Sequence, residues 1–297
     1  MGLISSIKRW NSIVFNLKRD RKKIDDNQGN IRRLAVNRFP NLVSAELDYK
    51  TRMAKREAKV YSQNGEDGIL MYILDSIGID SFSIMEIGIG NGSECNSRNL
   101  IENFGWNAWM VDGSVSNVNQ ANALYKNQIK AGNVNIQHSW VTKENIEDTI
   151  HKISVPKNVD ILSIDIDGND YWIWESINSI LPRVVIIEYN ASFGSERSVT
   201  IPYDPDFERF KKHKSGYYHG ASLKALEKLG KQKGYSLICC DSTGSNAIFI
   251  RKELDNSKQV FDAHSSDTLY YPLKKRMETM SLKDQYNQII HLKVINI

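Results

Sequence analysis

Beyond residue 60 the chain alternates short apolar segments with segments of helical periodicity, and this alternation limits the fold more than any other feature. We expect five strands, within residues 81–92, 107–114, 134–141, 159–168 and 183–190, with a helix between successive strands. Such a succession is typical of a mostly parallel sheet with helices on both faces. Residues 234–240 and 247–252, separated by the polar turn 241–246, predict a β-hairpin at the end of that sheet.

The first 59 residues show a different pattern. Apolar side chains recur there every three or four positions, as on one stripe of an amphipathic helix, and they are Leu3, Ile7, Trp10, Val14 and Leu17. We expect a basic, helical N-terminal extension over residues 1–59 and a separate domain over residues 60–297. The stripe within residues 1–19 is expected to pack on the protein itself or on a second copy, or else to lie on an anionic membrane surface.

Charge and hydropathy restrict the location and the partners. Residues 1–60 contain 15 Lys and Arg but 6 Asp and Glu, so the net charge of +4 originates in this segment and the rest of the chain is acidic. This distribution argues against a nucleic-acid substrate, which is usually bound by a basic face of the main domain. No apolar run is long enough for a transmembrane helix, and three cysteines without a C-x-x-C spacing indicate reduced thiols. We expect a cytoplasmic protein, with peripheral contact at the inner face of the membrane and homo-oligomer formation as further predictions.

A glycine-rich run follows the first expected strand and consists of Glu86, Gly88, Gly90, Asn91 and Gly92. Glycines at such a turn allow a tight bend and let a ligand approach the main chain. Asp112 ends the next strand, where a carboxylate can accept hydrogen bonds from the ribose hydroxyls of an adenosine. These features suit S-adenosylmethionine or NAD, although the G-x-G-x-x-G spacing of dinucleotide enzymes is absent. The alternative is a tight turn without a ligand.

Polar side chains lie at the ends of the fourth and fifth strands, and they are Asp165, Asp167, Glu188 and Asn190. Asp165 and Asp167 alternate with apolar residues, so both carboxylates are expected to project to one side of the fourth strand. Because the carboxyl ends of parallel strands share one edge of the sheet, we expect these side chains to meet there. Oxygen ligands of this kind suit Mg²⁺ or Ca²⁺, and Asp167 can also act as a base toward a hydroxyl. A buried hydrogen-bond network is the competing interpretation. His219, in a glycine-flanked loop, is a second candidate base, or else a polar capping residue.

Seven blocks of sequence occur in a fixed order over roughly residues 60–252. They are YSQNGEDG (61–68), MEIGIGNGSECNSRNL (85–100), WMVDGS (109–114), LSIDIDGNDYWIWESI (162–177), VVIIEYN (184–190), IPYDP (201–205) and YYHGASLKAL (217–226). This set resembles a bacterial branch of the FkbM-like class I S-adenosylmethionine-dependent methyltransferases.

The resemblance implies a Rossmann-like domain with a seven-stranded sheet, whose last strand is antiparallel, and S-adenosylmethionine as the cofactor. In such enzymes the glycine-rich turn, here residues 86–92, lies under the methionine part of the cofactor. Asp112 would hold the ribose, and Gly113 and Ser114 would lie near the adenine. Also assigned to the cofactor pocket are Gln63, Glu66 and Asp165.

The same resemblance implies O-methylation of a sugar hydroxyl, on a sugar or glycoconjugate of surface-polysaccharide or natural-product biosynthesis. The acid-rich residues 165–170 depart from the D-V-E-G pattern usual after the fourth strand of this family, so metal assistance by Mg²⁺ enters as an expectation. N-methylation of an amino sugar stays open. Two other functions are an NAD-dependent oxidoreductase and a non-catalytic partner protein that retains the fold.

Overall fold

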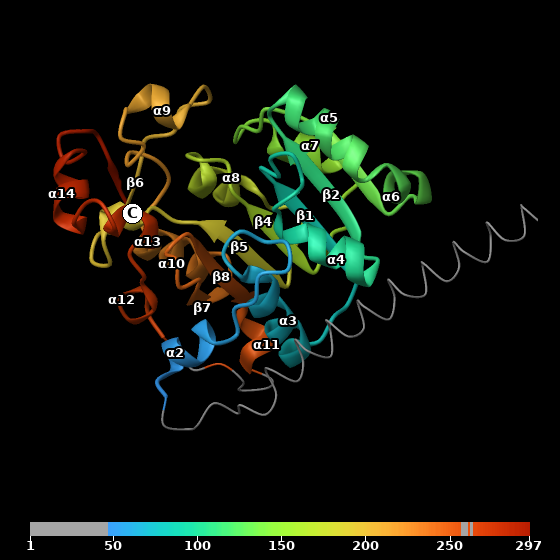
Figure 1. Ribbon diagram of the computed structural model, residues 1–297, viewed down its shortest axis with the longest axis horizontal. Coiled ribbons are helices and arrows are strands. Elements are labelled where there is room, and N and C mark those ends of the chain that lie inside the picture. The colour runs from blue at the N-terminus through green and yellow to red at the C-terminus, as the bar shows by residue number, and fades with distance from the viewer. Residues whose placement is uncertain (1–46, 257–260, 262–263) are drawn as a thin grey trace, which may run out of the picture. The chain divides into compact units, whose positions relative to one another are not determined.

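The computed structural model describes residues 47–256, 261 and 264–297, of which Tyr49–Ile297 belong to one compact unit. Its strands lie side by side with helices around them (Figure 1). The stripe expected within residues 1–19 lies outside the described residues. Helix α2 (Tyr49–Ala54) begins this unit and is fixed to the rest of it by a hydrogen bond from Tyr49 Oη to Ile238 O at 3.0 Å. The division of the chain after residue 59 stays a prediction.

Seven strands form one sheet of order β3-β2-β1-β4-β5-β8-β7. They are β1 (Ser83–Ile87), β2 (Asn107–Asp112), β3 (Val134–His138), β4 (Ile161–Ile164), β5 (Val184–Glu188), β7 (Tyr235–Cys240) and β8 (Asn246–Arg251). Strands β1 to β5 pair in parallel, whereas β8 runs antiparallel to both β5 and β7. The expected Rossmann-like α/β sheet, mostly parallel with an antiparallel last strand, is confirmed.

Helices connect these strands on both faces. They are α3 (Glu66–Ile77), α4 (Asn96–Phe104), α5 (Val115–Leu124), α6 (Lys126–Ala131), α7 (Ile146–Lys152), α8 (Asp170–Ser176) and α10 (Leu223–Gln232). The strands run outward from β1 to β3 and then start again from β4 in the other direction. Since parallel crossovers are right-handed, α4 and α5 cover one face and α8 and α10 the other. The order reverses between β1 and β4, and open sheets bind ligands at such a switch point.

The central strands are buried because helices cover both faces of the sheet. Strands β1 and β4 are buried at every position, so apolar residues predominate on both of their faces instead of alternating with exposed polar ones. The larger of the two apolar clusters among the described residues surrounds the sheet and includes Trp106, Trp174 and Phe249. The three cysteines, Cys95, Cys239 and Cys240, are free and buried in it.

Two local details differ from expectation. The helix expected after β2 is two helices, because the chain turns at Tyr125, whose buried hydroxyl donates to Gly92 O at 2.7 Å. Strand β4 ends at Ile164, so Asp165 and Asp167 lie on the loop beyond it instead of alternating along the strand. Asp167 has a φ of 58°, which turns this loop back toward α8.

The periodicity did not predict eight further short elements of the described chain. They are η1 (Ala191–Phe193), β6 (Val199–Thr200), α9 (Arg209–Lys212), α11 (Lys252–Asn256), α12 (Ser266–Leu269), α13 (Lys274–Met277), α14 (Leu282–Asn287) and β9 (Ile295–Asn296). Of these, α11 follows β8 at the amino end of β5. β9 pairs with β6 in a separate two-stranded sheet, and α12 contacts α10 and β7. The C-terminal segment, red in Figure 1, therefore returns to the side of the sheet formed by β5, β8 and β7.

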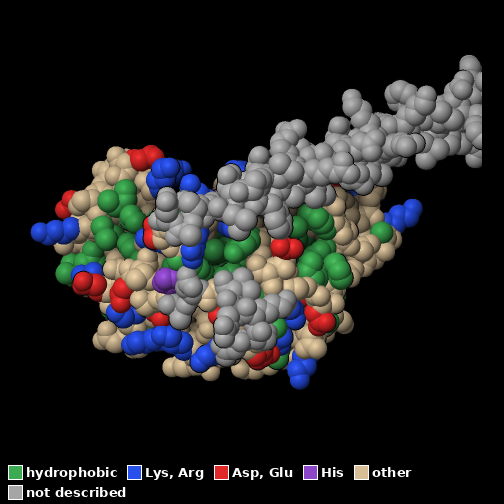
Figure 2. Space-filling view, turned by 90° about the horizontal axis from the view of Figure 1, so that it is seen from below, with side chains coloured by type: hydrophobic (Ala, Val, Ile, Leu, Met, Phe, Trp, Pro, Cys, Tyr) green, Lys and Arg blue, Asp and Glu red, His purple; other side chains and the backbone are tan. Residues whose placement is uncertain are grey.

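The surface carries charges of both signs. On the face drawn in Figure 2, acidic and basic side chains are interspersed between patches of hydrophobic side chains. None of the helices in the part of the chain that the structure describes is long and apolar enough to span a membrane.

Candidate functional site

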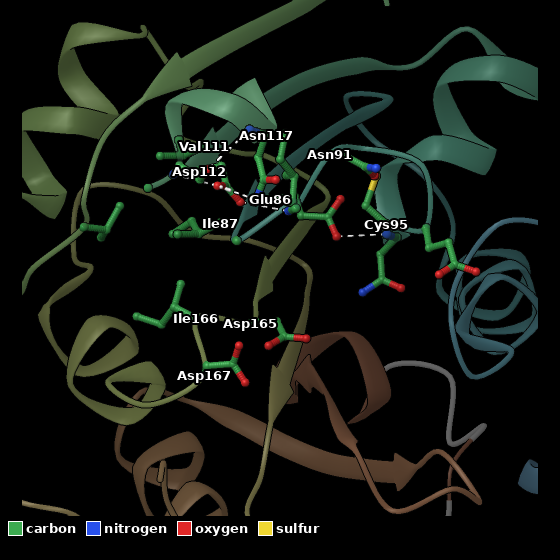
Figure 3. A pocket seen from close by; sticks show the side chains of 18 of the residues that line it. Glu86, Ile87, Asn91, Cys95, Val111, Asp112, Asn117, Asp165, Ile166 and Asp167 are labelled. Carbon is green, nitrogen blue, oxygen red and sulfur yellow. Dashed lines mark hydrogen bonds between the residues drawn. The ribbon is translucent and has the colours of Figure 1, made fainter. Parts of the chain in front are cut away.

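A pocket of about 570 Å³ opens at the carboxyl ends of β1, β2 and β4, at the point where the strand order reverses. It is lined by most of the residues that the sequence assigned to a cofactor: Gln63, Glu66, Glu86, Gly88, Gly90, Asn91, Asp112, Gly113, Ser114 and Asp165. Asp167 also lines it. Glu188, Asn190, His219 and Gly92 are absent from its wall. In Figure 3, Asp165 and Asp167 lie on the opposite side of the pocket from Asp112 and Glu86.

The glycines of the turn after β1 have three different tasks. Gly88 (φ 86°) passes so close to the next loop that a Cβ would lie 1.7 Å from Asp165 O. A Cβ on Gly90 (φ 56°) would meet nothing within 4 Å, so this glycine leaves open space on the pocket side. A Cβ on Gly92 would lie 2.8 Å from the Tyr125 ring. Gly92 thus closes the turn against the protein, and its assignment to the cofactor finds no support in its position.

Glu86 is buried under the turn and caps helix α4. Its carboxylate accepts hydrogen bonds from Asn96 N and Ser97 N, both at 2.8 Å, and from Ser163 Oγ at 3.3 Å. Cys95, the residue before α4, provides no side-chain cap, so Glu86 satisfies the first free amides of this helix. Burial raises the pKa of Glu86, and these hydrogen bonds oppose the rise. Glu86 shapes the pocket, and its bonding capacity is largely used within the protein.

Asp112 is held by its own surroundings but keeps one free acceptor position. Its Oδ1 accepts from Ser114 N at 2.8 Å and from Asn117 Nδ2 at 3.1 Å, whereas its Oδ2 accepts from Gly90 N at 2.8 Å. A carboxylate oxygen can accept two hydrogen bonds, so Oδ2 has one acceptor position left. The carboxylate lines the pocket, where a ligand hydroxyl can fill that position.

Two neighbouring walls complete this half of the pocket. Glu66 is buried, and its Oε1 accepts from Asn64 Nδ2 at 3.1 Å and from Asn246 Nδ2 at 2.8 Å, so it ties α3 to β8. Gln63 is exposed toward the opening. On the other wall, the Trp140 ring packs over Gly113, where a Cβ would lie 2.8 Å from Trp140 Cε3.

The loop after β4 is organised by Asp170, the first residue of α8. Its two carboxylate oxygens accept from Ile166 N and Gly168 N, both at 2.9 Å. This clamp leaves Asp165 exposed toward the pocket, and no hydrogen bond of its carboxylate occurs among the described residues. Although the side chain is accessible from the pocket, the surrounding walls partly desolvate its carboxylate, and this desolvation together with repulsion by Glu188 raises the pKa of Asp165 well above its ordinary value. Asp165 is therefore a carboxylate that faces the pocket without a hydrogen-bond partner among the described residues, and its surroundings favour its protonated form.

The expected acidic cluster forms, but it also contains a positively charged side chain, that of Arg209. Ligand oxygens of Asp165, Asp167 and Glu188 lie within 4.8 Å of one another. Arg209 Nη1 donates to Asp167 Oδ1 and lies 3.6 Å from Glu188 Oε1. Burial would raise the pKa of Glu188, but the facing His219 ring and the Arg209 guanidinium lower it.

Asn190 is not free to bind a metal in this geometry. Its Oδ1 accepts from Ser192 N at 3.0 Å and from Arg276 Nη1 at 3.2 Å, and its Nδ2 donates to the carbonyls of Tyr217 and His219. The amide oxygen thus already accepts two hydrogen bonds within the protein. The sequence interpretation of a buried hydrogen-bond network describes Asn190 better than that of a metal ligand.

His219 is buried behind the cluster instead of facing the pocket. It is 1% exposed, and its Nε2 lies 3.0 Å from an Arg276 nitrogen. Since arginine can only donate, Nε2 accepts and the ring proton is on Nδ1, which lies 3.4 Å from Glu188 Oε2. Burial lowers the pKa of His219, so the ring is neutral at pH 7. From this position His219 can orient Glu188, but it does not reach a ligand in the pocket.

Sequence reasoning missed three residues that shape the site. Arg209 stands in the lysine-rich stretch around α9, which reads as a solvated basic segment, and Arg276 lies in the C-terminal region without strong periodicity. Trp140 looked like the end of the third strand, yet it follows β3 and its Nε1 donates to Pro205 O at 2.7 Å. These three residues stand in or beside loops rich in aromatic and charged side chains. That local context does not show which distant residue each of them contacts.

Comparisons with known proteins add a weak likeness. No family model matches the chain, and no curated protein matches it. Among solved structures it is similar to the N-terminal domain of EvdMO1 with SAH bound, at 11% identity over 64% of this chain and 81% of that chain, with a TM-score of 0.39. A putative caffeoyl-CoA O-methyltransferase from Staphylococcus aureus shows 14% identity over 63% and 82%, with a TM-score of 0.43. An O-methyltransferase from Bacillus cereus in complex with SAH shows 14% identity over 73% and 96%, with a TM-score of 0.40. Likeness at this level does not identify the activity of this chain.

Proposed function

We propose that this protein transfers a methyl group from S-adenosylmethionine to a hydroxyl of a small acceptor. The observation that carries the proposal is the charge of the pocket. Six carboxylate side chains line it, from Glu66, Glu86, Glu94, Asp112, Asp165 and Asp167, and among the described residues no Lys, Arg or His does. An environment of this kind attracts a cationic ligand and repels an anionic one.

The same observation argues against a dinucleotide. A dinucleotide enzyme binds the pyrophosphate at the N-terminus of the helix that follows the glycine-rich turn. Here the Glu86 carboxylate already accepts from Asn96 N and Ser97 N at that N-terminus. A pyrophosphate would have to displace a buried carboxylate and would then lie beside further acids. We therefore rank the NAD-dependent oxidoreductase below the methyltransferase.

The residues present fit S-adenosylmethionine, which supplies an electrophilic methyl group on a positively charged sulfur. The free acceptor position on Asp112 Oδ2 suits a ribose hydroxyl, and the Trp140 ring beside Gly113 suits an adenine face. The open space at Gly90 lets a ligand approach the main chain. Gln63 can bind the polar end of the cofactor at the opening.

The acceptor is expected beside the loop after β4. Asp165 faces the pocket there with a raised pKa, so its carboxylate can take the proton of an acceptor hydroxyl as the oxygen attacks. Asp167 is less available for this role because Arg209 already donates a hydrogen bond to it. The choice of a sugar hydroxyl, and of polysaccharide or natural-product biosynthesis in the cytoplasm, rests on the sequence resemblance.

Titration calorimetry with S-adenosylhomocysteine, next to a titration with NADH, tests the cofactor. We expect micromolar binding of the first and none of the second. Binding of NADH alone would refute the proposal, and binding of neither would favour the non-catalytic partner protein.

The variant Asp165→Asn separates chemistry from binding. It keeps the size of the side chain but cannot take a proton, so methyl transfer should fall by about a hundredfold or more while S-adenosylhomocysteine binding is retained. Asp148→Asn, on the exposed side of α7, is the matched control. A variant of Asp165 with full activity would remove this residue from the mechanism.

A further inference from the structure

We propose that Arg209 is the resident cation of the carboxylate cluster at the ends of β4 and β5, in the position that a divalent metal ion would require. The proposal deepens the proposed function, and its activity measurement rests on that function, whereas its binding measurement does not. It assigns to Arg209 the task of positioning Asp167 and Glu188, so that Asp165 alone is left free toward the pocket.

The contacts of the guanidinium support this assignment. One nitrogen, Nη1, hydrogen-bonds Asp167 and lies 3.6 Å from Glu188 Oε1. Oxygens of these two residues and of Asp165 lie within 4.8 Å of one another, which is close enough for one central cation to serve all three. Arginine is suited to hold two carboxylates at once, because its planar guanidinium presents several donors in fixed directions.

The guanidinium is also held in place from the other side. Arg209 Nε donates to Gly216 O at 2.8 Å, and the side chain is only 15% exposed. The chain just before Arg209 is anchored over the loop after β4, because the Phe207 ring packs where a Gly168 Cβ would lie, 2.2 Å from Cδ1. Arg209 is therefore a built part of the site rather than a surface charge that folds over it.

The charges around the cluster leave little attraction for a metal ion. Asp167 and Glu188 contact Arg209, and Arg276 lies behind Glu188 and contributes to lowering its pKa. A divalent ion at the centre would lie next to the Arg209 guanidinium and be repelled by it. It would also lack the amide ligand expected from Asn190, whose Oδ1 is occupied. Metal binding therefore requires that Arg209 move away.

Titration with Mn²⁺, followed by electron paramagnetic resonance of the free ion, tests the proposal on the full chain. The wild-type protein should bind no Mn²⁺ in this cluster. In Arg209→Gln, Asp167 and Glu188 lose the cation that lies between them, so the Mn²⁺ affinity of the three-carboxylate cluster should rise by at least about tenfold. Lys211→Gln, which removes an exposed positive charge from the same helix, is the matched control and should behave like wild type. A purely structural role of Arg209 would not create a metal site.

Activity gives the second measurement. Wild-type methyl transfer should be the same with Mg²⁺ and with EDTA. Arg209→Gln should lower the rate, and Arg209→Lys should recover part of that loss, because lysine keeps the charge but not the planar guanidinium.

Stoichiometric Mn²⁺ binding by the wild type, or inhibition of the wild type by EDTA, would overturn the proposal. So would a folded Arg209→Gln with no gain in Mn²⁺ affinity. If that variant does not fold, the wild-type titration and Arg209→Lys decide alone. An inactive wild-type protein that binds no Mn²⁺ would count against the proposed function and not against this inference.

Discussion

The two rims of the pocket hold their carboxylates in opposite ways. At the ends of β1 and β2, Glu86 and Asp112 are held mainly by backbone amides from the adjoining turns, such as Asn96 N, Gly90 N and Ser114 N. At the ends of β4 and β5, Asp167 and Glu188 are held by side chains from elsewhere in the chain. These are Arg209 of α9, His219 of the loop before α10 and, through His219, Arg276 of α13.

The difference shows which half of the site can change without loss of the fold. A rim built from backbone amides depends on the path of the chain itself, so its geometry follows from the glycine turn and the helix that it opens. A rim built from long side chains depends on segments outside the β/α repeats. Changes in α9 or in the C-terminal segment can therefore alter the β4–β5 rim alone.

The substitution Gly88→Ala should distort both rims and cause the largest loss of stability among the variants considered. Its Cβ would lie 1.7 Å from Asp165 O at a positive φ, so the turn and the loop after β4 must separate. We expect a loss of about 3 kcal/mol or more in the free energy of unfolding, measured by urea denaturation. Gly90→Ala, with open space around its Cβ, should cost only about 1 kcal/mol but weaken S-adenosylhomocysteine binding. Equal losses of stability in the two variants would contradict the close approach at Gly88.

Asp112→Asn should disturb the β1–β2 rim alone. The asparagine side chain has only one oxygen, so it can accept from Gly90 N or from Ser114 N but not from both. Its NH₂ group would then face the other backbone N–H, and two donors would be placed against each other. We expect S-adenosylhomocysteine affinity to fall by about a hundredfold in calorimetry, while the Mn²⁺ behaviour of Arg209→Gln is unchanged in the double variant. Unaltered affinity would show that Asp112 serves the turn and not the ligand.

Arg276→Met should disturb the β4–β5 rim alone. It removes the donors to His219 Nε2, Asn190 Oδ1 and Ser192 Oγ, so buried acceptors lose their partners. We expect a loss of about 2 kcal/mol in unfolding free energy and a lower rate of methyl transfer, with S-adenosylhomocysteine affinity retained. The exposed neighbour Lys275→Met is the control, and a similar loss there would refute a specific role of Arg276.

Trp140→Phe should have the smallest effect and show whether the rims communicate. It keeps a ring over Gly113 but loses the hydrogen bond from Nε1 to Pro205 O, which connects the β3 side of the pocket with the chain leading to α9. We expect about 1 kcal/mol or less in stability and a few-fold change in S-adenosylhomocysteine affinity. If affinity falls as far as in Asp112→Asn, the ring itself carries most of the adenine contact.

Much of the fold was predictable because its signals are local. Apolar strands covered on both faces, helical periodicity and a glycine turn each depend on a few adjacent residues, and they predicted the five β/α repeats and the hairpin of β7 and β8. Short elements such as α9, α13 and the β6–β9 pair were not predictable. They are too brief to show a period, and contacts far along the chain stabilise them.

By itself, the sequence determined the pocket at the ends of β1 and β2, where Glu86 and Asp112 accept hydrogen bonds from main-chain groups of the adjoining turns. Only the tertiary structure decided the state of the acids after β4 and β5. The folded chain buries His219 and engages the amide oxygen of Asn190 in a hydrogen bond with Ser192 N. It also brings Arg209 to Asp167 from 42 residues away in the sequence. The physical reason is that an amide donor is present at every residue, whereas a compensating charge must be delivered by a folded segment. The acids alone therefore looked like a metal site, and the folded chain supplies a guanidinium in its place.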